Sequence, residues 1–151
     1  AWTDLDGDGH DELVIGAGRG GKLAVYRSNG QGGFTPVPAW AWTAADDLTG
    51  VVGWIPSSGQ RALLVGQANY ESPGNAQSSV LLWPFRQTNP LTPSLSPGGG
   101  EGARRAGEGP TNSLAAAQGP QTAAQLPHSI GPLAVADVDG DGDLDVFVGG
   151  R

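Results

Sequence analysis

Short apolar runs, each followed by glycine, recur along the chain and predict β-strands. They cover residues 13–15, 63–65 and 146–148. Runs of this length, rich in Leu, Ile and Val and bounded by glycine, are typical of strands buried in a sheet. The pattern therefore predicts at least three buried strands.

Further segments extend the β pattern. Residues 22–27, 79–85 and 130–136 read as strands, and residues 34–37 read as an edge strand because Pro36 cannot donate a hydrogen bond to a neighbour. Only the alanine-rich residues 114–125 hint at a helix, which Gly119-Pro120 would divide. We expect an all-β chain.

The strands belong to a repeat. Residues 4–16 match residues 137–149 without a gap, and residues 54–66 are a degraded copy that has lost every acid. Several short strands in each unit of about 50 residues predict β-propeller blades, each a four-stranded sheet. We count two blades and the start of a third.

The repeat divides the chain into four parts. We expect a repeat with an acidic loop at residues 1–50, a degenerate repeat at 51–88, an insert at 89–113, and a connector with the start of a third repeat at 114–151. The insert is rich in Pro, Gly and Ser, so we expect it to be disordered. It resembles the translation of a dispersed palindromic DNA repeat of GC-rich bacterial genomes, but an ordinary flexible loop explains it equally well.

Charge and composition exclude some classes of partner and of covalent link. The net charge is -7, and ten of the fifteen acids fall in residues 4–12 and 137–145. This balance argues against a nucleic-acid partner, which needs a basic patch. No apolar run is long enough to insert into a membrane, and the absence of cysteine excludes disulfides. Because methionine is also absent, we take the chain to be a processed product or an excerpt.

The two acidic segments carry the candidate chemistry. Each places carboxylates at positions 1, 3, 5 and 9, a glycine at position 6, and a backbone carbonyl at position 7. A hard cation such as Ca²⁺ takes six to eight oxygen ligands, and the glycine permits the sharp bend that directs them inward. An EF-hand is excluded because its position 12 needs Glu, whereas Ile15 and Val148 stand there within β-runs. Solvated acidic turns are the remaining alternative.

The acidic loop followed by a short apolar run resembles the FG-GAP or VCBS repeat, which builds the seven-bladed propellers of integrin α subunits and many bacterial extracytoplasmic proteins. Residues 131–151 are particularly similar to ASPIC/UnbV-associated proteins of this class. The resemblance implies that the chain is part of a seven-bladed ring with two Ca²⁺ sites. Glu12 departs from the usual aspartate of the family. The implied side-chain ligands are Asp4, Asp6, Asp8, Glu12, Asp137, Asp139, Asp141 and Asp145, and the implied carbonyl ligands are His10 and Asp143.

Three function classes remain open. We favour a non-catalytic, Ca²⁺-binding module for protein–protein or adhesion-type interaction, because the chain shows no nucleophile motif and only two histidines. A carbohydrate-binding propeller is the second class. We expect the five tryptophans to pack between blades, and in the alternative Trp40 and Trp42 are candidate sugar-contacting residues if they share one strand face. The third is the propeller of a secreted polysaccharide-active enzyme.

The expected partners and location follow from this interpretation. We expect a protein or glycan ligand together with the remaining blades of the same chain. Cytosolic Ca²⁺ is too low for sites with the dissociation constants of extracellular modules. We therefore expect the protein to work outside the cytoplasm, as a secreted, periplasmic or cell-surface protein.

Overall fold

The computed structural model describes residues 1–56, 59–72, 78–85 and 119–150, and the described chain forms three antiparallel β-sheets. The expected insert, residues 89–113, lies outside the described residues. Apart from the single 3₁₀ turn η1 (Pro38–Trp40), the regular elements described are all strands. The all-β prediction is confirmed. No helix in the described residues has the length and apolarity needed to cross a membrane.

Unit 1 is the first sheet, with strand order β1-β2-β3-β4 and with β5 paired to β3. Its strands are β1 (Trp2–Thr3), β2 (Glu12–Ile15), β3 (Lys22–Ser28), β4 (Phe34–Pro36) and β5 (Trp42–Thr43). The predicted strands at 13–15, 22–27 and 34–37 are therefore present. Strand β4 pairs only with β3, so Pro36 stands on an edge as expected.

Unit 2 is a four-stranded sheet in the order β6-β7-β8-β9. Its strands are β6 (Leu48–Trp54), β7 (Ala62–Gln67), β8 (Ser78–Pro84) and β9 (Gln121–Leu126). The suggestion of a helix over 114–125 is wrong for the residues described, because residues 121–126 form β9. Strand β8 offers β9 a row of backbone partners from Ser78 to Leu82, and this pairing outweighs the intrinsic helical preference of the alanines.

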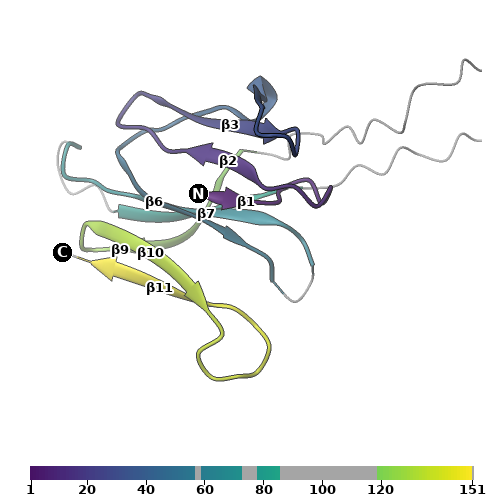
Figure 1. Cartoon of the computed structure of the whole chain (residues 1–151). Helices are drawn as coiled ribbons and strands as arrows, with labels where there is room; N and C mark the ends of the chain where they lie inside the picture. Colours follow the sequence, from purple (N-terminus) through teal and green to yellow (C-terminus); the bar gives the residue numbers. More distant parts are fainter. Residues whose placement is uncertain (57–58, 73–77, 86–118, 151) are drawn as a thin grey trace, which may run out of the picture.

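Unit 3 is the hairpin of β10 (Ile130–Ala136) and β11 (Asp145–Gly150). Figure 1 shows the three units as stacked layers, with unit 2 in the middle, unit 1 on one side and the hairpin on the other. Two apolar cores lie between the layers. The core between units 1 and 2 includes Val14, Leu63 and Trp83, and the core between units 2 and 3 includes Leu64 and Ile130.

Burial of the three repeated runs depends on position in this stack. In β7 both faces are covered: Leu63 and Val65 join the first core, and Leu64 joins the second. In the apolar run of β2, residues 13–15, only Val14 is fully buried, and Ile15 is 48% exposed. The expectation of a buried strand fails most clearly for β11, where Phe147 is 60% exposed. Among the sheets of the described residues, only the middle one has a neighbour on each side.

Two glycines allow the close packing of β6 against both neighbours. A Cβ at Gly53 would lie 2.2 Å from Oγ1 of Thr3 in unit 1. A Cβ at Gly50 would lie 3.0 Å from the backbone nitrogen of Leu133 in unit 3. Side chains at these positions would therefore push the layers apart.

The tryptophans of residues 40 and 42 do not form an exposed strand face. Trp40 ends the 3₁₀ turn η1 and is 1% exposed, because Pro38 starts a turn where a strand was expected. Its ring packs on Phe85 with centroids 5.3 Å apart, and Trp42 packs on Trp83 at 6.4 Å. Trp40 and Trp83 pack between the blades, and the prediction of Trp40 as a sugar-contacting residue is wrong.

Candidate metal centre

Two acidic loops join paired strands in the same way. Loop 1 (residues 4–11) joins β1 to β2, and loop 2 (residues 137–144) joins β10 to β11. Glu12 and Asp145 are the first residues of the strands that follow, and they pair with Thr3 and Ala136. The ninth position of both motifs is therefore held by a sheet rather than by a free loop.

Loop 1 folds around its own carboxylates. Asp4 accepts hydrogen bonds from the backbone N–H groups of Gly7 at 2.6 Å and Gly9 at 3.2 Å. Asp6 accepts from Asp8 at 3.1 Å, and Asp8 accepts from His10 at 2.8 Å. These are local aspartate turns, which short acidic side chains form with backbone two to five residues ahead. The loop thus turns the carboxylates of positions 1, 3 and 5 inward.

Loop 2 repeats this scheme bond for bond. Asp137 accepts from Gly140 at 2.8 Å and from Gly142 at 3.1 Å. Asp139 and Asp141 accept from the second residue ahead of each, at 3.2 Å and 2.8 Å. Glycines with positive φ occupy the same places, at 80° and 88° in loop 1 and at 78° and 92° in loop 2. Two loops 133 residues apart therefore share one backbone design.

Each loop brings three carboxylates together. Oxygens of Asp4, Asp6 and Asp8 lie within 4.8 Å of one another in loop 1. In loop 2 the group is Asp137, Asp139 and Asp145. Glu12 is outside the first group and Asp141 is outside the second. The structure thus gathers six of the eight predicted side-chain ligands.

Glu12 is buried at the base of loop 1. Its Oε2 accepts a hydrogen bond from the backbone N–H of Leu5 at 2.8 Å, as Asp145 does from Val138 at 3.0 Å. The side chain is 0% exposed, and Oε1 has no hydrogen-bond partner. Burial raises the pKa of Glu12 from 4.5 to about 7, and the charges of Asp6 and Asp8 add to the effect. A buried carboxylate oxygen without a donor is a position that a cation would satisfy.

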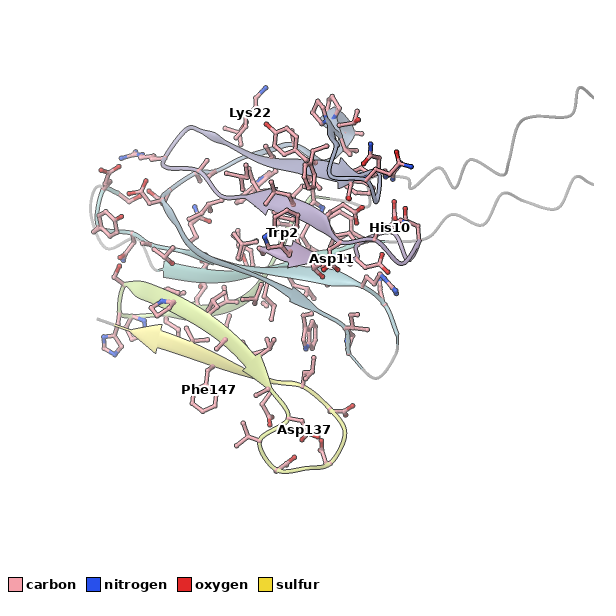
Figure 2. All side chains as sticks on the ribbon, in the orientation of Figure 1. Trp2, His10, Asp11, Lys22, Asp137 and Phe147 are labelled. Atoms are coloured by element: carbon pink, nitrogen blue, oxygen red, sulfur yellow. The ribbon has the colours of Figure 1, made fainter. Side chains whose placement is uncertain are left out.

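The two predicted carbonyl ligands differ in surroundings. The His10 side chain is exposed and rests on the turn at Gly30, where a Cβ would come within 2.9 Å of the imidazole. Asp143 is exposed in loop 2. Figure 2 shows His10 on loop 1 and Asp137 on loop 2, on the two outer layers of the stack. The backbone N–H of each predicted carbonyl ligand donates a hydrogen bond within its own loop, from His10 to Asp8 and from Asp143 to Asp141.

Two arginines that the sequence analysis did not single out contact loop 1. Arg61 precedes β7 and forms an ion pair with Asp4 at 3.1 Å, and Arg27 on β3 forms one with Asp6 at 2.6 Å. Burial raises the pKa of Asp4, but the hydrogen bonds from Arg61, Gly7 and Gly9 hold it below its ordinary value. Burial of Asp6 prevails over the charge of Arg27 and raises its pKa. The sequence does contain one signal for the Arg61 contact. Arg61 is a basic residue in the degenerate copy, which has no acid of its own to pair with it.

The degenerate copy keeps the strands but not the carboxylates. Trp54 pairs with Ala62, so Ala62 occupies the place that Glu12 holds in unit 1. This connection contacts both neighbouring loops: Arg61 contacts loop 1, and Nε1 of Trp54 donates to the carbonyl of Leu144 in loop 2 at 3.4 Å.

Residues 4–54 match the family model of the FG-GAP-like repeat. This segment carries an FG-GAP-like repeat. The match covers loop 1, strands β2 to β5 of unit 1, and strand β6 of unit 2. No curated protein and no solved structure matches the chain. Together with the antiparallel sheets, the match supports repeat units of the propeller type.

Proposed function

We propose that the chain is a Ca²⁺-binding part of an integrin-like propeller that works outside the cytoplasm and binds a protein partner without catalysis. The observation that carries the proposal is the identical hydrogen-bond scheme of loops 1 and 2. A chance acidic turn has no reason to recur with the same bonds and the same glycine conformations. We also propose that the chain is related to ASPIC/UnbV-associated proteins, which the motif of residues 131–151 resembles.

The donor set fits a hard cation. Oxygens that each bind Ca²⁺ at roughly 2.4 Å can be at most about 4.8 Å apart. The three carboxylates of each loop lie within that span. Glu12 adds a buried oxygen without a donor at the base of loop 1. When bound, Ca²⁺ would neutralise carboxylates that otherwise repel one another and would fix the loops on their sheets.

Equivalent apolar positions of units 1 and 3 differ in their exposure. Leu5 and Val14 are 1% and 2% exposed against unit 2, whereas their counterparts Val138 and Phe147 are 62% and 60% exposed. Figure 2 shows Phe147 pointing away from the stack. The positions that pack against the next layer in unit 1 are thus exposed in unit 3, where they can contact a partner. We propose that further propeller units pack on this face.

The opposite end of the stack offers a second face of this kind. Trp2 and Phe34 are 58% and 42% exposed, and their rings lie 5.5 Å apart on the outer side of unit 1. Exposed aromatic residues also suit a sugar, which keeps the glycan-binding propeller as the second candidate. Quenching of tryptophan fluorescence by oligosaccharides, abolished in Trp2→Ala, would favour that candidate.

Calorimetric titration of the whole chain with CaCl₂ tests the proposal. We expect two sites in the wild type and one site in each of Asp8→Ala and Asp139→Ala. Asp11→Ala is the matched control, because it removes one exposed loop charge at a position outside the proposed ligands. Absence of calcium binding, or two sites remaining in the double variant Asp8→Ala/Asp139→Ala, would contradict it.

The proposed extracytoplasmic location rests on the expected affinity for Ca²⁺. Extracellular calcium modules have dissociation constants of roughly 0.1–1 mM, far above free cytosolic Ca²⁺. A dissociation constant below the micromolar range in the same titration would argue for a cytosolic role instead.

A further inference from the structure

Loops 1 and 2 share one backbone design but differ in their counter-charges. Loop 1 with Glu12 contains five acids and is contacted by two arginines. In the described part of the chain, the five aspartates from 137 to 145 form no ion pair. We propose that Arg61 and Arg27 are built-in counter-ions of loop 1. Loop 2 therefore binds Ca²⁺ first, and Arg61 couples filling of loop 1 to the contact between units 1 and 2. The inference rests on the proposed calcium binding.

Arg61 reaches loop 1 from the neighbouring sheet. Its Nε donates to the backbone carbonyl of Asp4 at 2.8 Å, and its Nη2 donates to Oδ2 of Asp4 at 3.1 Å. The same Oδ2 accepts the N–H of Gly9. A cation that binds Asp4 must therefore share an oxygen with a guanidinium group and meet its positive charge.

Arg27 is fixed from the other side. Its guanidinium carbon lies 5.5 Å from the centroid of the buried Trp40 ring, and Nη2 is 2.6 Å from Oδ2 of Asp6. The Nε atom is buried and has no hydrogen-bond partner. Because the guanidinium contacts both the ring and the carboxylate, its movement away from loop 1 would break both contacts. Arg27 therefore remains a permanent charge beside loop 1.

Loop 2 presents the same oxygens to solvent. Oδ2 of Asp137 accepts from Gly142, as Oδ2 of Asp4 does from Gly9, but no guanidinium joins it in the described residues. The number of ligand charges is a main determinant of calcium affinity. With two fewer positive charges beside it, loop 2 should bind Ca²⁺ on the order of tenfold more tightly than loop 1.

The same contact stabilises the metal-free chain. Arg61 joins two layers by two hydrogen bonds in a partly buried place. Its removal should lower the stability of the metal-free state and raise the affinity of loop 1 for Ca²⁺. These two changes have opposite signs, which a merely structural residue would not produce.

The experiment isolates loop 1 by using Asp139→Ala as the background. Calorimetry with CaCl₂ compares Asp139→Ala, Asp139→Ala/Arg61→Gln and Asp139→Ala/Arg19→Gln. Arg19 is the matched control, because it is exposed and pairs with Asp46 at 3.9 Å, away from both loops. We expect Arg61→Gln to tighten loop 1 by roughly threefold, because Arg27 remains and the tenfold difference belongs to both arginines, and Arg19→Gln to leave it unchanged. Thermal melting in chelator should show a lower Tm for Arg61→Gln.

A second comparison needs no arginine variant. Asp8→Ala leaves loop 2 alone and Asp139→Ala leaves loop 1 alone, so their dissociation constants should differ by about tenfold in favour of loop 2. Equal dissociation constants for the two loops, or a loop 1 affinity that Arg61→Gln leaves unchanged, would overturn the inference while calcium binding stands. Failure of both loops to bind calcium would instead overturn the proposed function.

Discussion

Substitution of Glu12 by Gln should make the metal-free chain more stable at alkaline pH. Glu12 is 0% exposed, and in the folded chain its pKa is raised from 4.5 to about 7, chiefly by burial. Between these two values the folded chain holds a proton that the unfolded chain has released. The free energy of unfolding therefore falls as pH rises through this window, and the full loss is present above pH 7.

The magnitude follows from the size of the shift. A change from 4.5 to about 7 corresponds to about 3 kcal/mol at 25 °C. Glutamine stays neutral and keeps an oxygen for the N–H of Leu5, but its NH₂ group takes the place of the unpartnered Oε1 at a cost of about 1 kcal/mol. Glu12→Gln should therefore exceed the wild type by about 2 kcal/mol at pH 8 and lose this advantage by pH 5.

Urea unfolding followed by tryptophan fluorescence, in chelator at pH 5 and pH 8, measures this difference. Glu71→Gln is the matched control, because Glu71 is exposed, and it should behave as the wild type at both pH values. In Ca²⁺ at about twentyfold its dissociation constant, the wild type should gain about 2 kcal/mol at loop 1. The advantage of Glu12→Gln should then disappear at pH 8. A stability difference between Glu12→Gln and the wild type that is the same at both pH values in chelator would refute the reasoning.

Three further outcomes are expected. Val14→Asp should lower the free energy of unfolding in urea by about 4 kcal/mol or more, because it buries a charge in the core between units 1 and 2. Phe147→Asp should change this free energy by at most about 0.5 kcal/mol, because Phe147 is exposed. Equal losses in the two variants would contradict the assigned faces. Gly53→Ala should lower stability by roughly 1–3 kcal/mol through its contact with Thr3, whereas Gly119→Ala, with open space around it, should be neutral. Millimolar CaCl₂ should raise the Tm by several degrees at fixed ionic strength, and an equal rise with MgCl₂ would mean an unselective anionic surface.

Much of the candidate site is local and was therefore readable from the sequence. The hydrogen bonds from Gly7 and Gly9 to Asp4 span at most five residues, so the spacing of aspartate and glycine is sufficient to specify the turn. The same spacing predicted loop 2, where the bonds recur. The β-runs were predicted for the same reason, because short apolar runs rich in Leu, Ile and Val and bounded by glycine favour strands.

Tertiary packing decided which of these residues are buried. Leu5 and Val138 occupy the same position of one motif, yet they are 1% and 62% exposed, because unit 2 covers only the first. Strand β9 depends on the open edge of β8, and Trp40 is buried by Phe85 from the next sheet. No local pattern carries these contacts, since their partners lie far away in the chain.

The charge balance of loop 1 was decided in the same way. Arg61 is 57 residues from Asp4 in sequence, and only the stacking of units 1 and 2 brings it within 3.1 Å. The sequence by itself determined two equivalent acidic loops, because their turns are built from neighbouring residues. The fold made them unequal, because it places two arginines on loop 1 and leaves loop 2 in solvent.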